Sequence, residues 1–168
     1  MKNILLFFCL IILSLGAFSQ NPWDQWDKNY KEVDISELLN FEKAYADSVD
    51  RGLIEGKYYA RIDKFRFSAY YTGEKREISE ETKKSMKNAY KLYAAQRDQL
   101  SLLDEVRFEY KFTIDNVDYW FSMQSALDKD FKKEVKKDDE VYLYCLFLNE
   151  HQVNGKLTNS FLISEFRQ

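Results

Sequence analysis

The chain has 168 residues, which is the usual length of one domain and is enough to bury a hydrophobic core. It carries 25 basic and 28 acidic side chains, and this mildly acidic balance argues against a general nucleic-acid-binding protein, which normally has a basic surface. Two cysteines and one histidine are too few for the usual zinc sites, and no P-loop, dinucleotide-binding or GxSxG motif is present. We therefore expect neither a cofactor, nor a metal, nor a nucleic-acid partner.

Residues 1–19 have the three-part pattern of a cleaved signal peptide. Lys2 supplies the positive charge, residues 4–15 form an apolar run, and small residues precede a cut near Ser19–Gln20. The run is shorter than the roughly 20 residues that a membrane-spanning helix needs, and no later run approaches that length. The sequence therefore predicts a secreted or periplasmic protein, of the kind that bacteria export, with no transmembrane segment after cleavage.

Cleavage would leave 149 residues and would remove the single charge of Lys2, so that the net charge changes from −3 to −4. It would also remove Cys9 and leave Cys145 as the one cysteine, which excludes an intramolecular disulfide. Cys145 lies inside the apolar run 141–148. Because free cysteines are among the most buried residues, we expect a buried structural thiol.

The mature chain begins with a predicted irregular leader, residues 20–33, and continues as a single α+β domain over residues 34–168. The leader holds the only proline and two of the three tryptophans, so we expect it to pack back on the domain. A helix is predicted from Asp34, because Asp34 and Glu37 have the spacing of a capping box, and Gly52 is a suitable stop. Its apolar residues, Phe41 included, are expected to face a core.

Residues 58–72 alternate between apolar and polar side chains, which predicts a half-buried strand that ends at Gly73. Ser79 is a suitable N-cap for the longest predicted helix, whose apolar spacing continues to Arg97. Residues 106–114 alternate even more clearly.

Asp115–Asn116 is a two-residue turn that tolerates positive φ, so residues 106–114 and 117–122 are predicted to form a hairpin. A short amphipathic helix is predicted over residues 123–135. Residues 141–148 are apolar on both faces and predict a central strand, and a turn at Asn154–Gly155 leads to a closing strand over residues 157–166.

This order of elements predicts an α+β fold with a mostly antiparallel sheet of about five strands, with two main helices and one short helix packed on it. Five strands with a helix between the third and fourth is also the order of the OB-fold, so an OB-like or SH3-like small barrel is one arrangement that fits. The long helix between the first two strands departs from the OB order.

Aromatic side chains give the best indication of a binding site. If Val117, Tyr119 and Phe121 face the core, then Asp118, Trp120 and Ser122 share the polar face of their strand, and an exposed tryptophan there can stack on a ligand. Tyr142 is expected on an outer face as well. These four candidate ligand-binding residues are Trp120, Asp118, Ser122 and Tyr142. The alternative is that a helix or the leader covers Trp120.

Catalytic sets are less well supported. A Cys145–His151 dyad would need the two side chains within hydrogen-bond reach, but a straight strand would separate them by about 20 Å, and His151 is predicted to be a solvated loop residue. We therefore predict a non-catalytic binding or structural domain for a protein, peptide or glycan. The alternative is a small secreted hydrolase with paired carboxylates, one of which has a raised pKa. The sequence does not determine the oligomeric state.

Overall fold

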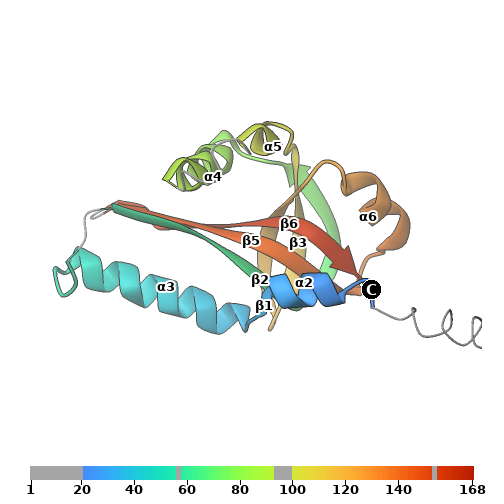
Figure 1. The fold of residues 1–168 in the computed structure, drawn as a ribbon, viewed down its shortest axis with the longest axis horizontal. Coiled ribbons are helices and arrows are strands. Elements are labelled where there is room, and N and C mark those ends of the chain that lie inside the picture. The colour runs from blue at the N-terminus through green and yellow to red at the C-terminus, as the bar shows by residue number, and fades with distance from the viewer. Residues whose placement is uncertain (1–20, 56–57, 93–99, 153–154) are drawn as a thin grey trace, which may run out of the picture.

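The computed structural model describes residues 21–55, 58–92, 100–152 and 155–168. Over these residues the protein is α+β, with a six-stranded mixed sheet and five helices (Figure 1). In chain order the elements are α2 Asp24–Asn29, β1 Lys31–Glu32, α3 Ile35–Asp50, β2 Tyr58–Glu77, α4 Glu80–Leu92, α5 Leu100–Asp104, β3 Phe108–Ile114, β4 Val117–Met123, α6 Asp128–Glu134, β5 Glu140–Gln152 and β6 Thr158–Arg167.

The long strand β2 organises the sheet, because it pairs antiparallel with β5 along residues 58–70 and with β3 along residues 70–77. β3 and β4 form an antiparallel hairpin, and β5 and β6 are also antiparallel. The sheet is mixed, since β1 runs parallel to β2 and β6 runs parallel to β4 over two residue pairs each, beside the four antiparallel pairings. The second parallel pair arises because α6 and β5 lie between β4 and β6 in the chain, so that β6 returns in the direction of β4.

Helices cover both faces of the strands β5 and β6 (Figure 1). Residues of β5 point alternately to opposite faces, so Leu146 and Leu148 pack against Met86 and Tyr90 of α4 on one side. On the other side, Phe147 belongs to a cluster that includes residues of α3. The part of the sheet next to α3 therefore forms the middle layer of three.

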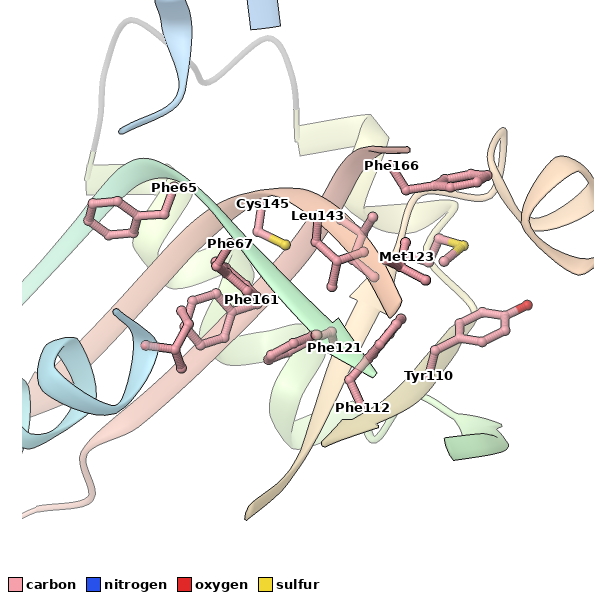
Figure 2. Close-up of a cluster of buried hydrophobic side chains, with 14 of the residues drawn as sticks. Phe65, Phe67, Tyr110, Phe112, Phe121, Met123, Leu143, Cys145, Phe161 and Phe166 are labelled. Atoms are coloured by element: carbon pink, nitrogen blue, oxygen red, sulfur yellow. The ribbon is translucent and has the colours of Figure 1, made fainter. Parts of the chain in front are cut away.

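A cluster of aromatic rings fills the main core (Figure 2). Phe121 of β4 is fully buried, and its ring centroid lies 5.0 Å from Phe161, 5.6 Å from Phe67 and 5.6 Å from Phe112. Cys145 lies in the same cluster with no exposed surface, as expected from its apolar run. The described chain is therefore packed around aromatic contacts, without a disulfide.

The leader is not irregular throughout, because residues 24–29 form α2 and residues 31–32 form β1. It does pack on the sheet, as its aromatic content predicts: Trp23 stacks on Tyr144 at 5.7 Å with an interplanar angle of 5°. Asp27 also accepts a hydrogen bond from the Tyr144 hydroxyl at 2.7 Å. These contacts order the segment, which sequence periodicity alone does not reveal.

Two predicted strand ends are wrong. β2 does not end at Gly73; the strand continues to Glu77, and its pairing with β3 is irregular between Tyr71 and Lys75, where Gly73 takes a φ of +85°. The glycine thus forms a bulge within the strand. β5 extends through His151, which pairs with Tyr59 of β2 and is 1% exposed instead of solvated.

Local signals located several elements correctly. The Asp34 side chain caps α3 by accepting from the Glu37 amide, and Ser79 caps the following helix by accepting from Thr82. Asp115 and Asn116 both have positive φ in the β3–β4 turn. By contrast, Phe41 is 60% exposed and does not face the core.

Several predictions lie outside the described residues, namely the signal peptide over 1–19, the helical residues 93–97 and the turn residue 154. Within the described ranges, no helix combines the length and the apolar character needed to cross a membrane.

Candidate functional site

A groove of about 480 Å³ lies between α3, the first half of β4 and the start of β6. Trp120 is one of the residues that line this groove. Its lining residues come from three segments that are far apart in the sequence: Leu39, Asn40, Lys43, Asp118, Tyr119, Trp120, Leu157, Asn159 and Phe161.

The groove exists because β4 and β6 pair over only a short stretch. Ser122 pairs with Leu162 and Met123 with Ile163, and within the described chain no other register pair joins the two strands. Residues 117–121 of β4 pair with β3 on one side, and residues 158–161 of β6 pair with β5. The facing sides of these two stretches are left open, and α3 lies beside the opening.

Aromatic side chains from both β4 and β6 line the groove, and a cation packs against the largest one. The Arg76 guanidinium lies 4.1 Å from the centroid of the Trp120 ring, and its Nε donates to Glu109 Oε2 at 2.7 Å. Cation–π contacts of this kind hold the ring in one orientation. The partly buried Trp120 ring therefore has Arg76 as a packing partner on one face.

The two charged residues of the groove differ in their surroundings. Asp118 lies 3.0 Å from Lys111 Nζ and accepts from Thr113 at 2.6 Å, and these hydrogen bonds hold the pKa of Asp118 below its ordinary value. Lys43 has no acidic partner among the described residues. The charge left uncompensated in the groove is thus the positive charge of Lys43.

A buried polar network lies beneath the groove. Asn149 Nδ2 donates to Glu42 Oε2 at 3.0 Å and to Asn159 Oδ1 at 2.9 Å, and Arg61 Nη2 lies 2.7 Å from Glu42 Oε1. Burial raises the pKa of Glu42, and the Arg61 charge acts in the opposite direction. Because the Glu42 carboxylate accepts a hydrogen bond from Asn149, Asn149 must present its nitrogen to it.

This network also orients Asn159. Asn159 lines the groove and its side-chain oxygen accepts from Asn149, so its amide nitrogen is left as a donor of two hydrogen bonds. Together with Lys43, it gives the polar part of the groove a donor character.

The structure brings only two of the four predicted site residues together. Asp118 and Trp120 both line the groove, on the outer side of β4. Ser122 is buried, and its Oγ lies 3.7 Å from Met86 Sδ of α4. Tyr142 lines a separate hollow of about 220 Å³ and accepts a hydrogen bond from Arg66 at 3.2 Å.

Sequence reasoning missed the other groove residues for identifiable reasons. Tyr119 packs against the core as its alternation with Trp120 predicts, and because it is only partly buried it also lines the groove. Asn149 follows the apolar run 141–148 and Asn159 precedes the apolar residues 161–163, so neither position stands out as a polar site in the sequence. Nothing in the sequence of α3 connects Asn40 and Lys43 with β4.

Comparisons with protein-family models, with curated proteins and with solved structures find no match for this chain. The described residues contain no group of three or more histidine, cysteine, aspartate or glutamate side chains arranged to hold a metal ion. The geometry of the groove is therefore the basis for assigning a function to this protein.

Proposed function

We propose that this protein is a non-catalytic binding domain, exported to the periplasm or secreted, whose ligand occupies the groove between α3, β4 and β6. The observation that carries the proposal is the gathering of three aromatic rings with two carboxamides and one uncompensated lysine in a single hollow. Ligand sites are typically concave, mostly apolar and equipped with a few polar groups, and the volume of this groove is in their usual range.

The proposed fold type is an OB-like barrel. It is supported by the order of strand pairings, in which β2, β3, β4, β6 and β5 follow one another and β5 pairs again with β2. The position of α6 between β4 and β5, the third and fourth strands along the chain when counted from β2, is also similar to the OB-fold. In folds of this type, ligands are often bound on the sheet that includes the equivalents of β3 and β4.

The hydrolase alternative has less support. It requires two carboxylates in one cleft, at least one of them with a raised pKa. Asp118 is the one carboxylate among the described residues that line the groove, and its pKa is lowered. Glu42 has a raised pKa, but it lies beneath the groove in an ion pair with Arg61. This arrangement favours binding over acid–base catalysis.

Export is proposed from the sequence pattern of residues 1–19. The test is intact-mass analysis of the protein recovered from an expression host that exports signal-bearing proteins. A mass corresponding to residues 20–168 supports export with cleavage after Ser19, and recovery of the uncleaved chain in the cytoplasm contradicts it.

Binding in the groove is tested by NMR on ¹⁵N-labelled protein expressed from the full chain. The probes are cellotetraose, chitotetraose, tetragalacturonate and mixtures of blocked heptapeptides, each at millimolar concentration. We expect at least one probe to shift the Trp120 indole and the amides of residues 117–121. Trp120→Ala should lower the affinity for that probe by roughly tenfold or more, since tryptophans are frequent binding hot spots.

Tyr70→Ala is the matched control, because Tyr70 is an aromatic residue that is 52% exposed and does not line the groove. The Tyr70→Ala variant should bind the probe with the same affinity as the wild-type protein. If no probe shifts the groove residues, or if both variants weaken binding equally, the proposed site is wrong.

A further inference from the structure

We propose that the ligand of the groove is an extended peptide with an acidic side chain, which adds as a strand to the open side of β4. This inference rests on the proposed function and specifies its ligand. Three observations carry it: the open strand edge, the placement of aromatic side chains on both faces of that edge, and the donor character of the polar groups.

The first observation is the edge itself. Residues 117–121 of β4 pair with β3 on one side only, and pairing with β6 begins at Ser122. The unpaired side of a strand presents a row of N–H and C=O groups that another strand can bind. Phe121 is fully buried, so the accessible part of this edge is residues 117–120. Four residues at about 3.3 Å each give an edge of roughly 13 Å, which suits a short peptide strand.

The second observation is the position of the rings along this edge. Consecutive residues of a strand point to opposite faces, so Tyr119 and Trp120 lie on opposite faces of β4. A strand added beside them therefore gains an aromatic cross-strand neighbour on each face. Phe161, from the facing strand β6, lines the same groove.

The third observation is the chemistry of the polar groups. Lys43 and the amide nitrogen of Asn159 are donors, and Asp118 already accepts from Lys111 and Thr113. A carboxylate fits such a set because it only accepts hydrogen bonds. The combination of donors with a strand edge favours an acidic peptide over a glycan.

The test uses acetylated and amidated heptapeptide mixtures with a fixed central residue and Val, Thr, Tyr or Ser at the other positions. One mixture has Glu at the centre and the other has Gln. The Glu mixture should shift the amides of residues 117–121 and the Asn159 side chain, and should bind roughly fivefold more tightly than the Gln mixture, as one ion pair at a partly exposed site allows.

Two controls separate strand addition from other modes. Lys43→Gln should reduce the affinity for the Glu mixture to that for the Gln mixture, whereas Lys129→Gln, an exposed lysine on α6, should leave both unchanged. A Glu mixture that is N-methylated at alternate backbone positions should lose binding, because methylation removes the main-chain donors that a strand requires.

The outcomes distinguish this inference from the proposed function. If tetragalacturonate shifts the groove residues and the peptides do not, the groove binds a ligand but the peptide assignment is wrong. If the methylated mixture binds as well as the unmethylated one, or if Glu and Gln mixtures bind equally, strand addition by an acidic peptide is also wrong. If neither peptides nor saccharides shift residues 117–121, both proposals fail.

Discussion

Asp27 connects α2 to the outer face of the sheet, and its replacement by asparagine tests how the N-terminal segment is held. Its Oδ1 accepts from the Tyr144 hydroxyl at 2.7 Å and from Arg66 Nη1 at 2.8 Å. Hydrogen bonds to a charged group contribute about 1.5–3 kcal/mol, and the 29% exposure of the Asp27 side chain reduces this by solvent screening. Because asparagine keeps one acceptor oxygen, we expect Asp27→Asn to lower the free energy of unfolding at pH 7 by about 1–2 kcal/mol.

The pH dependence of this difference has a defined sign. The Tyr144 hydrogen bond, aided by the charges of Arg167 and Arg66, holds the pKa of Asp27 below its ordinary value of 3.8, although burial acts in the opposite direction. A carboxyl with a depressed folded-state pKa stabilises the protein above its unfolded-state pKa, and this contribution is lost as the pH falls through the folded-state pKa. The difference between wild type and Asp27→Asn should therefore shrink as the pH falls below 3.8.

The assay is urea denaturation of both proteins at pH 7 and at a series of acidic values, followed by tryptophan fluorescence, which reports on Trp23 and Trp26 of the same segment. Asp24→Asn is the matched control, since it removes the same charge from an exposed position of α2. Its effect should stay within about 0.5 kcal/mol. The reasoning would be refuted if both variants lost the same free energy of unfolding, or if the loss for Asp27→Asn persisted at acidic pH.

Other predictions concern the core, the bulge and the thiol. Phe121→Ala should cost about 3–5 kcal/mol in urea denaturation because it leaves a cavity among four rings, and a loss below about 1 kcal/mol would contradict the packing. Gly73→Ala should cost about 1–3 kcal/mol, because the residue has a φ of +85° and an added Cβ would lie 3.1–3.3 Å from the Lys137 side chain. Gly52→Ala, also at positive φ but in open space, should lower the free energy of unfolding by less than Gly73→Ala does. Equal losses of stability would mean that crowding against Lys137 plays no part at Gly73. Cys145 should resist alkylation in the folded protein and react in urea, since burial raises its pKa; rapid labelling of the native protein would show that the thiol is accessible.

Elements that depend on nearby residues were predictable from the sequence. The start of α3 follows from Asp34 and Glu37, which interact across one helical turn. The β3–β4 turn follows from Asp115 and Asn116, both of which tolerate positive φ. In these cases the residues that determine the structure lie within four positions of one another.

Features that depend on distant strands were not predictable in the same way. β2 continues past Gly73 because Lys75 pairs with Tyr110 of β3, and β5 continues to His151 because Tyr59 pairs with it. A glycine or a polar residue alone indicates a strand end, and only the partner strand overrides that signal. The irregular leader was a similar case, since α2 is held by contacts with Tyr144.

The residues of the candidate site likewise divide into those that local sequence patterns identify and those that only distant packing brings in. Trp120 and Asp118 were identified from alternation within one strand, and they do share the groove. Ser122 follows the same alternation, but α4 covers it, because the outer face of the sheet changes from open to covered along β4. Lys43 and Asn159 join the site only through the packing of α3 and β6 around β4.

The most direct test of the account is a map of the amide shifts that the acidic peptide mixture causes across the ¹⁵N-labelled protein. The account predicts that the largest shifts fall on residues 117–121, on Asn159 and on the Trp120 indole, and that they vanish when the peptide backbone is methylated. Shifts concentrated instead around α2 and Tyr144, or shifts that survive methylation, would contradict the assignment of the groove as the binding site for an added strand.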